Sequence, residues 1–202
     1  MIFNVPFYPQ EYRTDCGPTG LQMVLEFLDK PQDKKTLLDL VNSDRSGITW
    51  TLELAIAAAK LGFRAEYYSL HVGFNPAIFE LEYYRKEADS KSESEEKSKR
   101  SLIEASQYGV KTEERGLDLD EVLSKINQDC LSIVILDWGM IDGIDSYLGH
   151  FVPIVGYDNK NIYVHDPYIL NPAANMPISR ETFELARKSH GTDEDIVFFH
   201  RK

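Results

Sequence analysis

A chain of 202 residues, 43% of them hydrophobic and 11% aromatic, carries enough apolar side chains for a sizeable core. Its 22 basic and 33 acidic residues give a net charge of −11, which repels phosphate backbones and anionic lipid head groups. We therefore expect neither a nucleic acid nor a membrane as a partner, whereas a basic peptide or protein substrate would be attracted.

The start of the chain predicts an extended entry followed by a helix. Prolines disfavour helix in residues 2–10, and Gly17 with Pro18 mark the point where the helix begins. Its apolar stripe recurs at helical spacing in Leu21, Val24, Leu25 and Leu28. Cys16 then lies at the amino end of this helix, where free N–H groups and the helix dipole favour a thiolate. An isolated cysteine is more often a small buried apolar residue, so catalysis requires a partner elsewhere in the chain.

Trp50 precedes a predicted helix, for which Thr51 is the N-cap and Lys60 the last residue. A tryptophan at this position either forms the wall of a cleft or packs in the core, and core packing is the commoner outcome. An aromatic cluster follows in residues 78–85, which either faces a substrate or packs as part of a helix.

Residues 86–100 are strongly polar and contain no aromatic side chain. Such a segment is either a charged loop or the solvated start of a helix that becomes apolar at Leu102. Because predicted core segments lie on both sides of it, we do not interpret it as a linker. We expect one domain over residues 1–202.

The second half of the chain predicts a sheet. Residues 131–136 form a continuous apolar run typical of a central strand. Residues 149–158 and 161–167 predict a hairpin with its turn at residues 158–160. Two helices and a last strand are expected around it, at residues 118–126, 180–188 and 196–199. A helical first half and a sheet-rich second half make an α+β arrangement with the site at their junction.

His150 begins the first strand of the predicted hairpin and Asp166 lies at the end of the second. These ends are neighbours in an antiparallel hairpin, so the imidazole and the carboxylate can meet across the ladder. A cysteine, a histidine and a carboxylate that orients the imidazole are the groups that thiol catalysis requires. His150 follows Cys16 by 134 residues, within the spacing of papain-type enzymes.

Two features of this hairpin complicate the prediction. Pro153 cannot donate a ladder hydrogen bond, which predicts a sheet edge or a bulge. His165 is a rival base, although the alternation of a strand points its side chain away from the face of Asp166.

The segment before His150 is a candidate cleft rim or lid. Residues 137–149 form a predicted loop that contains Trp138 and several glycines and leads directly into His150. We therefore interpret Trp50, Trp138 and Gly149 as candidate substrate-binding residues.

A family resemblance is carried by Cys16-Gly17-Pro18, with Gln10 six residues earlier, and by Gly149-His150-Phe151-Val152 and Asp166-Pro167 downstream. This set resembles the papain-like fold of the bacteriocin-leader (double-glycine) cysteine peptidases. The chain is still more similar to the family of guanylyl cyclase domain-containing proteins of animals and plants. That similarity rests on Trp50-Thr51-x-x-Leu54-Ala55, Tyr83-Tyr84-Arg85-Lys86, Glu184-x-Ala186-Arg187 and the GTDEDI run at residues 191–196.

The resemblance implies a papain-like cysteine hydrolase, a peptidase or an amidase, that acts through a thioester intermediate. Cys16 would be the nucleophile, His150 the base and Asp166 the group that orients the imidazole. The resemblance also gives Gln10 a role, because its amide would stabilise an oxyanion together with the backbone N–H of Cys16.

Two other functions stay open. The closer family's name implies a cyclase that converts GTP to cGMP, which would need paired carboxylates for a metal, and Asp193, Glu194 and Asp195 are the available candidates. The chain has neither a phosphate-cradling glycine loop nor a clear basic cluster for this reaction. The other alternative is a catalytically silent peptide-binding module.

We expect no metal or other cofactor, because the histidines and cysteines lack the spacing of zinc ligands. The sequence contains no long apolar run and no charged-then-apolar leader, which predicts a cytoplasmic protein. The two cysteines, Cys16 and Cys130, do not make a disulfide framework.

Overall fold

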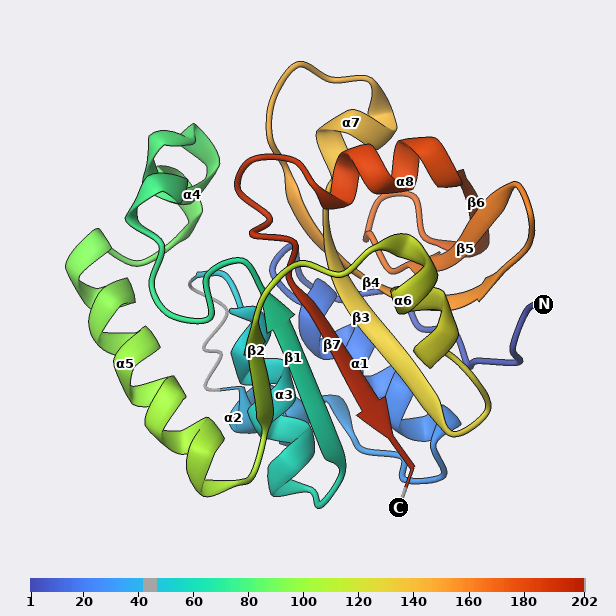
Figure 1. Cartoon of the computed structure of the whole chain (residues 1–202), viewed down its shortest axis with the longest axis horizontal. Helices are drawn as coiled ribbons and strands as arrows, with labels where there is room; N and C mark the ends of the chain where they lie inside the picture. Colours follow the sequence, from blue (N-terminus) through green and yellow to red (C-terminus); the bar gives the residue numbers. More distant parts are fainter. Residues whose placement is uncertain (42–46, 202) are drawn as a thin grey trace.

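In the computed structural model, which describes residues 1–41 and 47–201, seven strands form one sheet in the order β2-β1-β7-β3-β4-β5-β6 (Figure 1). The strands are β1 (Arg64–Ser69), β2 (Lys111–Glu114), β3 (Cys130–Asp137), β4 (Gly149–Tyr157), β5 (Asn161–Asp166), β6 (Ala173–Ser179) and β7 (Ile196–His200). Neighbouring strands are antiparallel except β1 and β2, which are parallel. The long α5 separates β1 from β2 in the chain, and a parallel pair needs such a crossover.

Helices lie on both faces of this sheet, with α1 and α3 behind it and α6 and α8 in front in the view of Figure 1. Their bounds are α1 (Cys16–Phe27), α2 (Lys34–Leu40), α3 (Thr51–Lys60), η1 (Pro76–Glu80), α4 (Glu82–Glu87), α5 (Lys91–Gln107), α6 (Leu119–Lys125), α7 (Trp138–Asp142) and α8 (Arg180–Arg187). The core lies between the helices and the sheet, and the central strand β3 is buried along its whole length. The α+β prediction is confirmed.

Helix α1 approaches the sheet closely because two glycines face it. A Cβ on Gly17 would lie 3.3 Å from side-chain atoms of Leu54 and Phe151, and one on Gly20 would lie 3.4 Å from Pro153. The spacing at Gly17 is tighter than ordinary contact and that at Gly20 is at its lower limit, so the glycines allow the helix to rest directly on β4. The amino end of α1, which begins at Cys16 itself, is thereby placed against the start of β4.

The β4–β5 hairpin is present with its turn where the sequence predicts it. Asp158 Oδ1 accepts hydrogen bonds from the backbone N–H groups of Lys160 and Asn161, which closes the turn. Pro153 predicted either a strand at the edge of the sheet or a bulge. The prediction of an edge strand is wrong, because β4 lies between β3 and β5. The register of the β4–β5 ladder shifts between Ile154 and Gly156, so an irregularity accommodates the strand beside the proline.

Two segments for which the sequence predicted a loop, in one case as an alternative to a helix, contain helices. Most of residues 86–100 belongs to α5, where Ser90 caps the helix by accepting a hydrogen bond from Glu93 N–H. The expected loop at residues 137–149 contains the short helix α7, capped by Asp137 and ended by Gly143 at a positive φ of 69°. Within the described residues, none of the helices is both long enough and apolar enough to cross a membrane.

Candidate active site

Cys16 occupies the first position of α1 and is half-buried. Burial alone would raise the pKa of its thiol. A hydrogen bond with His150, the charge of that imidazole and the backbone N–H groups of Phe151 and Gly17 outweigh burial and lower the pKa instead. The pKa shift favours a thiolate, the reactive form of cysteine.

His150 is held between the sulfur and a carboxylate. Its Nε2 lies 2.8 Å from Asp166 Oδ1, and both side chains are buried. With Nε2 engaged, Nδ1 is the ring nitrogen left for Cys16. Burial lowers the pKa of His150, but the hydrogen bonds with Asp166 and Cys16 more than compensate and raise it to about 9. The structure thus brings together three of the four predicted catalytic residues.

The ring of His150 is also fixed from its sides. The indole of Trp138 meets the imidazole edge-on, with ring centroids 4.7 Å apart, and Tyr168 contacts it at 6.1 Å. Trp138 stands directly after β3, beside the start of β4, and is itself buried. This packing limits rotation of the imidazole.

Gln10 lies close by, but its amide is directed elsewhere. Its backbone N–H donates to the carbonyl of Pro167, one residue beyond Asp166. Its Nε2 donates to the carbonyls of Tyr12 and Arg13, at 2.9 and 3.1 Å. Its buried Oε1 has no hydrogen-bond partner among the residues that the structure describes. The oxyanion role of Gln10 stays a prediction, and it requires the amide to turn away from these carbonyls.

His165 lies on the other face of β5, as the alternation of the strand predicts. Its Nε2 lies 3.1 Å from the carbonyl of Val5, and its Nδ1 accepts from the backbone N–H of Asn175. Phe7 packs on its ring at 5.2 Å. Both ring nitrogens are therefore used in holding the amino-terminal segment and β6, and His165 is not available as a base.

A cavity of about 500 Å³ opens beside Cys16 and His150. Trp50, Trp138 and Gly149, the three candidate substrate-binding residues, all line it. Trp50 combines both of its predicted positions, because it borders the cavity and also stacks on Tyr84 at 6.0 Å.

Sequence reasoning missed part of the wall of this cavity. Tyr147 lies within the predicted rim at residues 137–149 but is not among the predicted substrate-binding residues. Its hydroxyl lies 3.0 Å from that of Tyr84, and both hydroxyls donate to the carbonyl of Gly191. Tyr83 adds a hydrogen bond to the carbonyl of Gly149. The tyrosine-rich run at residues 83–84 was a usable signal, whereas its meeting with residues 147 and 191 depends on contacts between distant segments.

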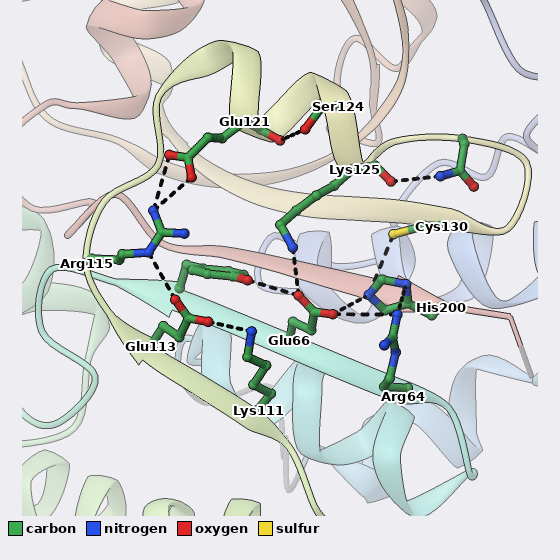
Figure 2. A network of polar contacts seen from close by, with 12 residues as sticks. Arg64, Glu66, Lys111, Glu113, Arg115, Glu121, Ser124, Lys125, Cys130 and His200 are labelled. Atoms are coloured by element: carbon green, nitrogen blue, oxygen red, sulfur yellow. Dashed lines mark hydrogen bonds and ion pairs between the residues drawn. The ribbon is translucent and has the colours of Figure 1, made fainter.

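A second cysteine and histidine lie where β3 begins, at the opposite end of that strand from its pairing with His150 (Figure 2). Cys130 Sγ is 3.9 Å from His200 Nε2, which is also 3.0 Å from Glu66 Oε1. Burial first, and then the charge of Glu66, raise the pKa of the Cys130 thiol to about 12. Proximity to a histidine therefore does not by itself activate a cysteine in this protein.

Comparison with solved structures defines the fold. The structure resembles a protein of Bacillus anthracis described as a C39-like peptidase, with a TM-score of 0.62 and 16% identity over 100% of this chain and 98% of that one. It also resembles the peptidase domain of Streptococcus ComA, with a TM-score of 0.53 and 17% identity over 98% of this chain and 100% of that one. A third similar structure is a double-glycine motif protease from an AMS/PCAT transporter in complex with the leader peptide. Its TM-score is 0.52 and its sequence identity is 19%, over 100% of this chain and 94% of that one. The fold is the papain-like fold of the C39-like cysteine peptidases.

The sequence itself places the chain in a family. Residues 5–199 match the family model described as guanylylate cyclase, and the chain belongs to that family. It is 29% identical over 218 aligned positions to guanylyl cyclase 1 of Arabidopsis thaliana, an alignment that covers 98% of this chain and 76% of the plant protein.

Proposed function

We propose that this protein is a papain-like cysteine hydrolase, a peptidase or an amidase, with Cys16 as nucleophile and His150 as proton carrier. The observation that carries the proposal is the juxtaposition of a thiol with a lowered pKa and an imidazole with a raised one at the edge of a cavity. These opposite shifts favour a thiolate–imidazolium pair, which is the active form of thiol hydrolases.

The first half of the reaction would form a thioester. The Cys16 thiolate attacks the acyl carbon, and the carbonyl oxygen takes up the negative charge of the tetrahedral intermediate. The backbone N–H of Cys16 at the start of α1 would stabilise that oxygen, together with the amide of Gln10. His150 then gives its proton to the leaving nitrogen as the carbon–nitrogen bond breaks.

The second half would release the product. Neutral His150 takes a proton from water, whose oxygen attacks the thioester carbon, and the thiolate leaves as the carbon–sulfur bond breaks. Asp166 accepts from Nε2 throughout, which keeps the ring oriented and stabilises the imidazolium. Trp138 would exclude bulk water from this exchange.

A peptide is the substrate class that the fold favours. One solved protein of this fold is described in complex with a leader peptide. The chain's net charge of −11 adds a general attraction for basic peptides.

The test is turnover by the purified full chain. Wild type and Cys16→Ala are compared on a panel of fluorogenic peptides, peptide amides and ubiquitin-like conjugates, with trapping by an electrophilic peptide probe. We expect turnover and probe labelling in wild type and neither in Cys16→Ala. Absence of turnover and labelling throughout the panel, or equal turnover by both proteins, would contradict the proposal.

The family description points to a cyclase, and the structure gives that reaction little support. The three candidate carboxylates do not form one cluster. Asp193 and Asp195 line the cavity and accept from Asn75 and Tyr67, whereas Glu194 pairs with the buried Arg187. No group of three or more histidine, cysteine, aspartate or glutamate residues within the described ranges is arranged to hold a metal. The same preparations should be incubated with GTP and magnesium. Formation of cGMP that survives Cys16→Ala would overturn our ranking.

A further inference from the structure

The cavity beside Cys16 has a second, acidic end. Asp195 and Asp193 line it, contributed by the segment that leads into β7. Tyr67 donates to Asp195 Oδ1 at 2.9 Å, and Asn75 Nδ2 donates to Asp193 Oδ1 at 2.8 Å. Thr51, at the start of α3, also hydrogen-bonds Asp195. The two carboxylates are thus fixed in place and directed at the same cavity as the thiol.

An aromatic wall connects the two ends. Tyr83, beside Gly149 at the Cys16 end, meets Tyr84 edge-on at 5.2 Å. Tyr84 stacks on Tyr147 at 5.5 Å and donates to the carbonyl of Gly191, four residues before Asp195. Trp50 also stacks on Tyr84, with ring centroids 6.0 Å apart. A ligand that extends from the sulfur towards Asp195 therefore passes along aromatic rings, which attract cations as well as apolar groups.

The basic side chains around the cavity are already neutralised. Arg13 pairs with Glu87, Lys86 with Glu82, and Lys97 with Glu53. Among the residues that the structure describes, no lysine or arginine pairs with Asp193 or Asp195. The one titratable base near Asp193 in this part of the chain is the imidazole of His71, 3.4 Å from Oδ1. Burial, together with the charge of Asp193, raises the pKa of Asp195 to about 7, as expected for a carboxylate that lacks a counterion.

A further polar group at this end lacks a partner. Thr49 lines the cavity and is 94% buried, since its relative exposure is 6%. Its Oγ1 has no hydrogen-bond partner in the described part of the chain. Buried hydroxyls are nearly always paired, so an unpaired one in the wall that also carries the two carboxylates indicates a hydrogen-bonding group that arrives with a ligand.

We propose that this end of the cavity, formed by Thr49, Trp50, Tyr84, Asp193 and Asp195, binds the ammonium or guanidinium group of a lysine or arginine side chain in the substrate. The proposal rests on the function proposed above and specifies its substrate class. The carboxylates supply the charge, Thr49 accepts a hydrogen bond, and the rings enclose the aliphatic stem and the cation. A free cationic small molecule would satisfy the same chemistry, and the experiment separates the two.

The first arm measures kcat/KM on matched peptides that differ at one position, lysine against norleucine and arginine against citrulline, scanned along the sequence. We expect wild type to prefer the cationic member by about 10-fold or more at one position. Asp195→Asn keeps the shape and should abolish that preference, and Asp193→Asn should weaken it. Glu113→Gln removes an equal charge from β2, outside the cavity, and should leave the preference unchanged.

The second arm does not depend on turnover. Binding of N-acetyl-lysine amide, N-acetyl-norleucine amide, agmatine and a lysine-containing peptide to Cys16→Ala is measured by calorimetry, with and without Asp195→Asn. If the lysine peptide binds and Asp195→Asn abolishes this binding, the result supports the subsite. This holds even if wild type hydrolyses no substrate, because only the hydrolase proposal would then fail.

Two results would overturn the subsite itself. One is turnover with no preference for a cation at any position. The other is tight binding of agmatine in the absence of binding by lysine peptides, which would assign the end of the cavity to a free cation.

Discussion

Two regions of this molecule place a cysteine, a histidine and a carboxylate together, with opposite consequences. At Cys16 the thiol pKa is lowered and the histidine pKa is raised to about 9. At Cys130 the thiol pKa is raised to about 12, and burial with the charge of Arg64 lowers the pKa of His200 (Figure 2). The residue types are nearly the same, so the difference lies in how the ring nitrogens are used.

In the Cys130 region, neither nitrogen of the ring is free for the sulfur. Arg64 lies 2.8 Å from His200 Nδ1, and because an arginine only donates, Nδ1 must accept. The ring proton is then on Nε2, where Glu66 accepts it, so no lone pair remains to deprotonate Cys130. At His150 the carboxylate holds only Nε2 and leaves Nδ1 for Cys16, which also begins a helix. Activation thus requires a free ring nitrogen and backbone donors at the sulfur.

The two regions should differ most in the effect on activity of replacing each cysteine with alanine. Cys16→Ala should reduce peptide hydrolysis by about 10⁴-fold or more, because it removes the nucleophile. Cys130→Ala should leave kcat/KM within about 2-fold, since its thiol stays protonated. Both are measured by steady-state kinetics, with circular dichroism to confirm folding. Equal losses in the two variants would break the comparison.

Oxyanion stabilisation is expected only in the Cys16 region. Gln10→Ala should lower kcat by about 100-fold while KM changes little, because the amide acts in the transition state. Gln10 is bonded to the carbonyls of Tyr12 and Arg13, so loop disorder is the competing explanation. The rate of iodoacetamide alkylation at Cys16 separates them, because alkylation needs no oxyanion donor. A parallel loss of alkylation would assign Gln10 to loop structure instead.

The Cys130 region should matter for stability instead. Burial opposes ionisation of Glu66, but hydrogen bonds from Lys125 and Tyr68 lower its pKa to about 2, below the ordinary 4.5. A carboxylate with a lowered folded-state pKa contributes stability that is complete above its unfolded pKa and is lost as pH falls through the folded one. After discounting for solvent screening, Glu66→Gln should cost on the order of 2 kcal/mol at neutral pH and flatten the acid limb between about pH 5 and pH 2.

Urea unfolding of wild type and Glu66→Gln across this pH range measures that contribution. Glu121→Gln, an exposed carboxylate paired with Arg115 in the same network, is the matched control and should cost less than about 0.5 kcal/mol. A constant difference between wild type and Glu66→Gln down to about pH 2 would contradict the linkage.

The smallest effect concerns the carboxylate beside His150. Asp166→Asn keeps an oxygen that can accept from Nε2 but removes the charge that helps to raise the pKa of His150. We expect about a 10-fold loss in kcat/KM and a shift of its alkaline limb from about pH 9 towards lower pH. An unchanged pH profile would show that the charge of Asp166 does not act on the imidazole.

Local patterns were sufficient to predict that Cys16, His150 and Asp166 lie together but not to predict the whole cavity. The helix after Cys16 and the hairpin from His150 to Asp166 follow from apolar periodicity and turn residues, so their ends could be placed from the sequence. The position of Pro153 was harder, because whether β4 is an edge strand depends on β5 pairing beyond it.

The acidic end of the cavity was not predictable in this way. The sequence predicts one solvated acidic turn at residues 193–195. In the structure, Asp193 and Glu194 adopt positive φ angles of 48° and 54°. This backbone turns Glu194 towards Arg187 while Asp193 and Asp195 line the cavity, and tertiary contacts with Tyr67, Asn75 and Arg187 select it.

Activation of Cys16 by His150 is the central claim, and the kinetics of cysteine alkylation test it directly. Wild type and His150→Ala are treated with iodoacetamide from about pH 5 to pH 10, and labelling of Cys16 and Cys130 is followed by peptide mass spectrometry. We predict rapid labelling of Cys16 at about pH 6 in wild type, at least about 10-fold slower labelling in His150→Ala, and little labelling of Cys130 in either protein. Equal rates at Cys16 in the two proteins, or faster labelling of Cys130 than of Cys16, would contradict the account.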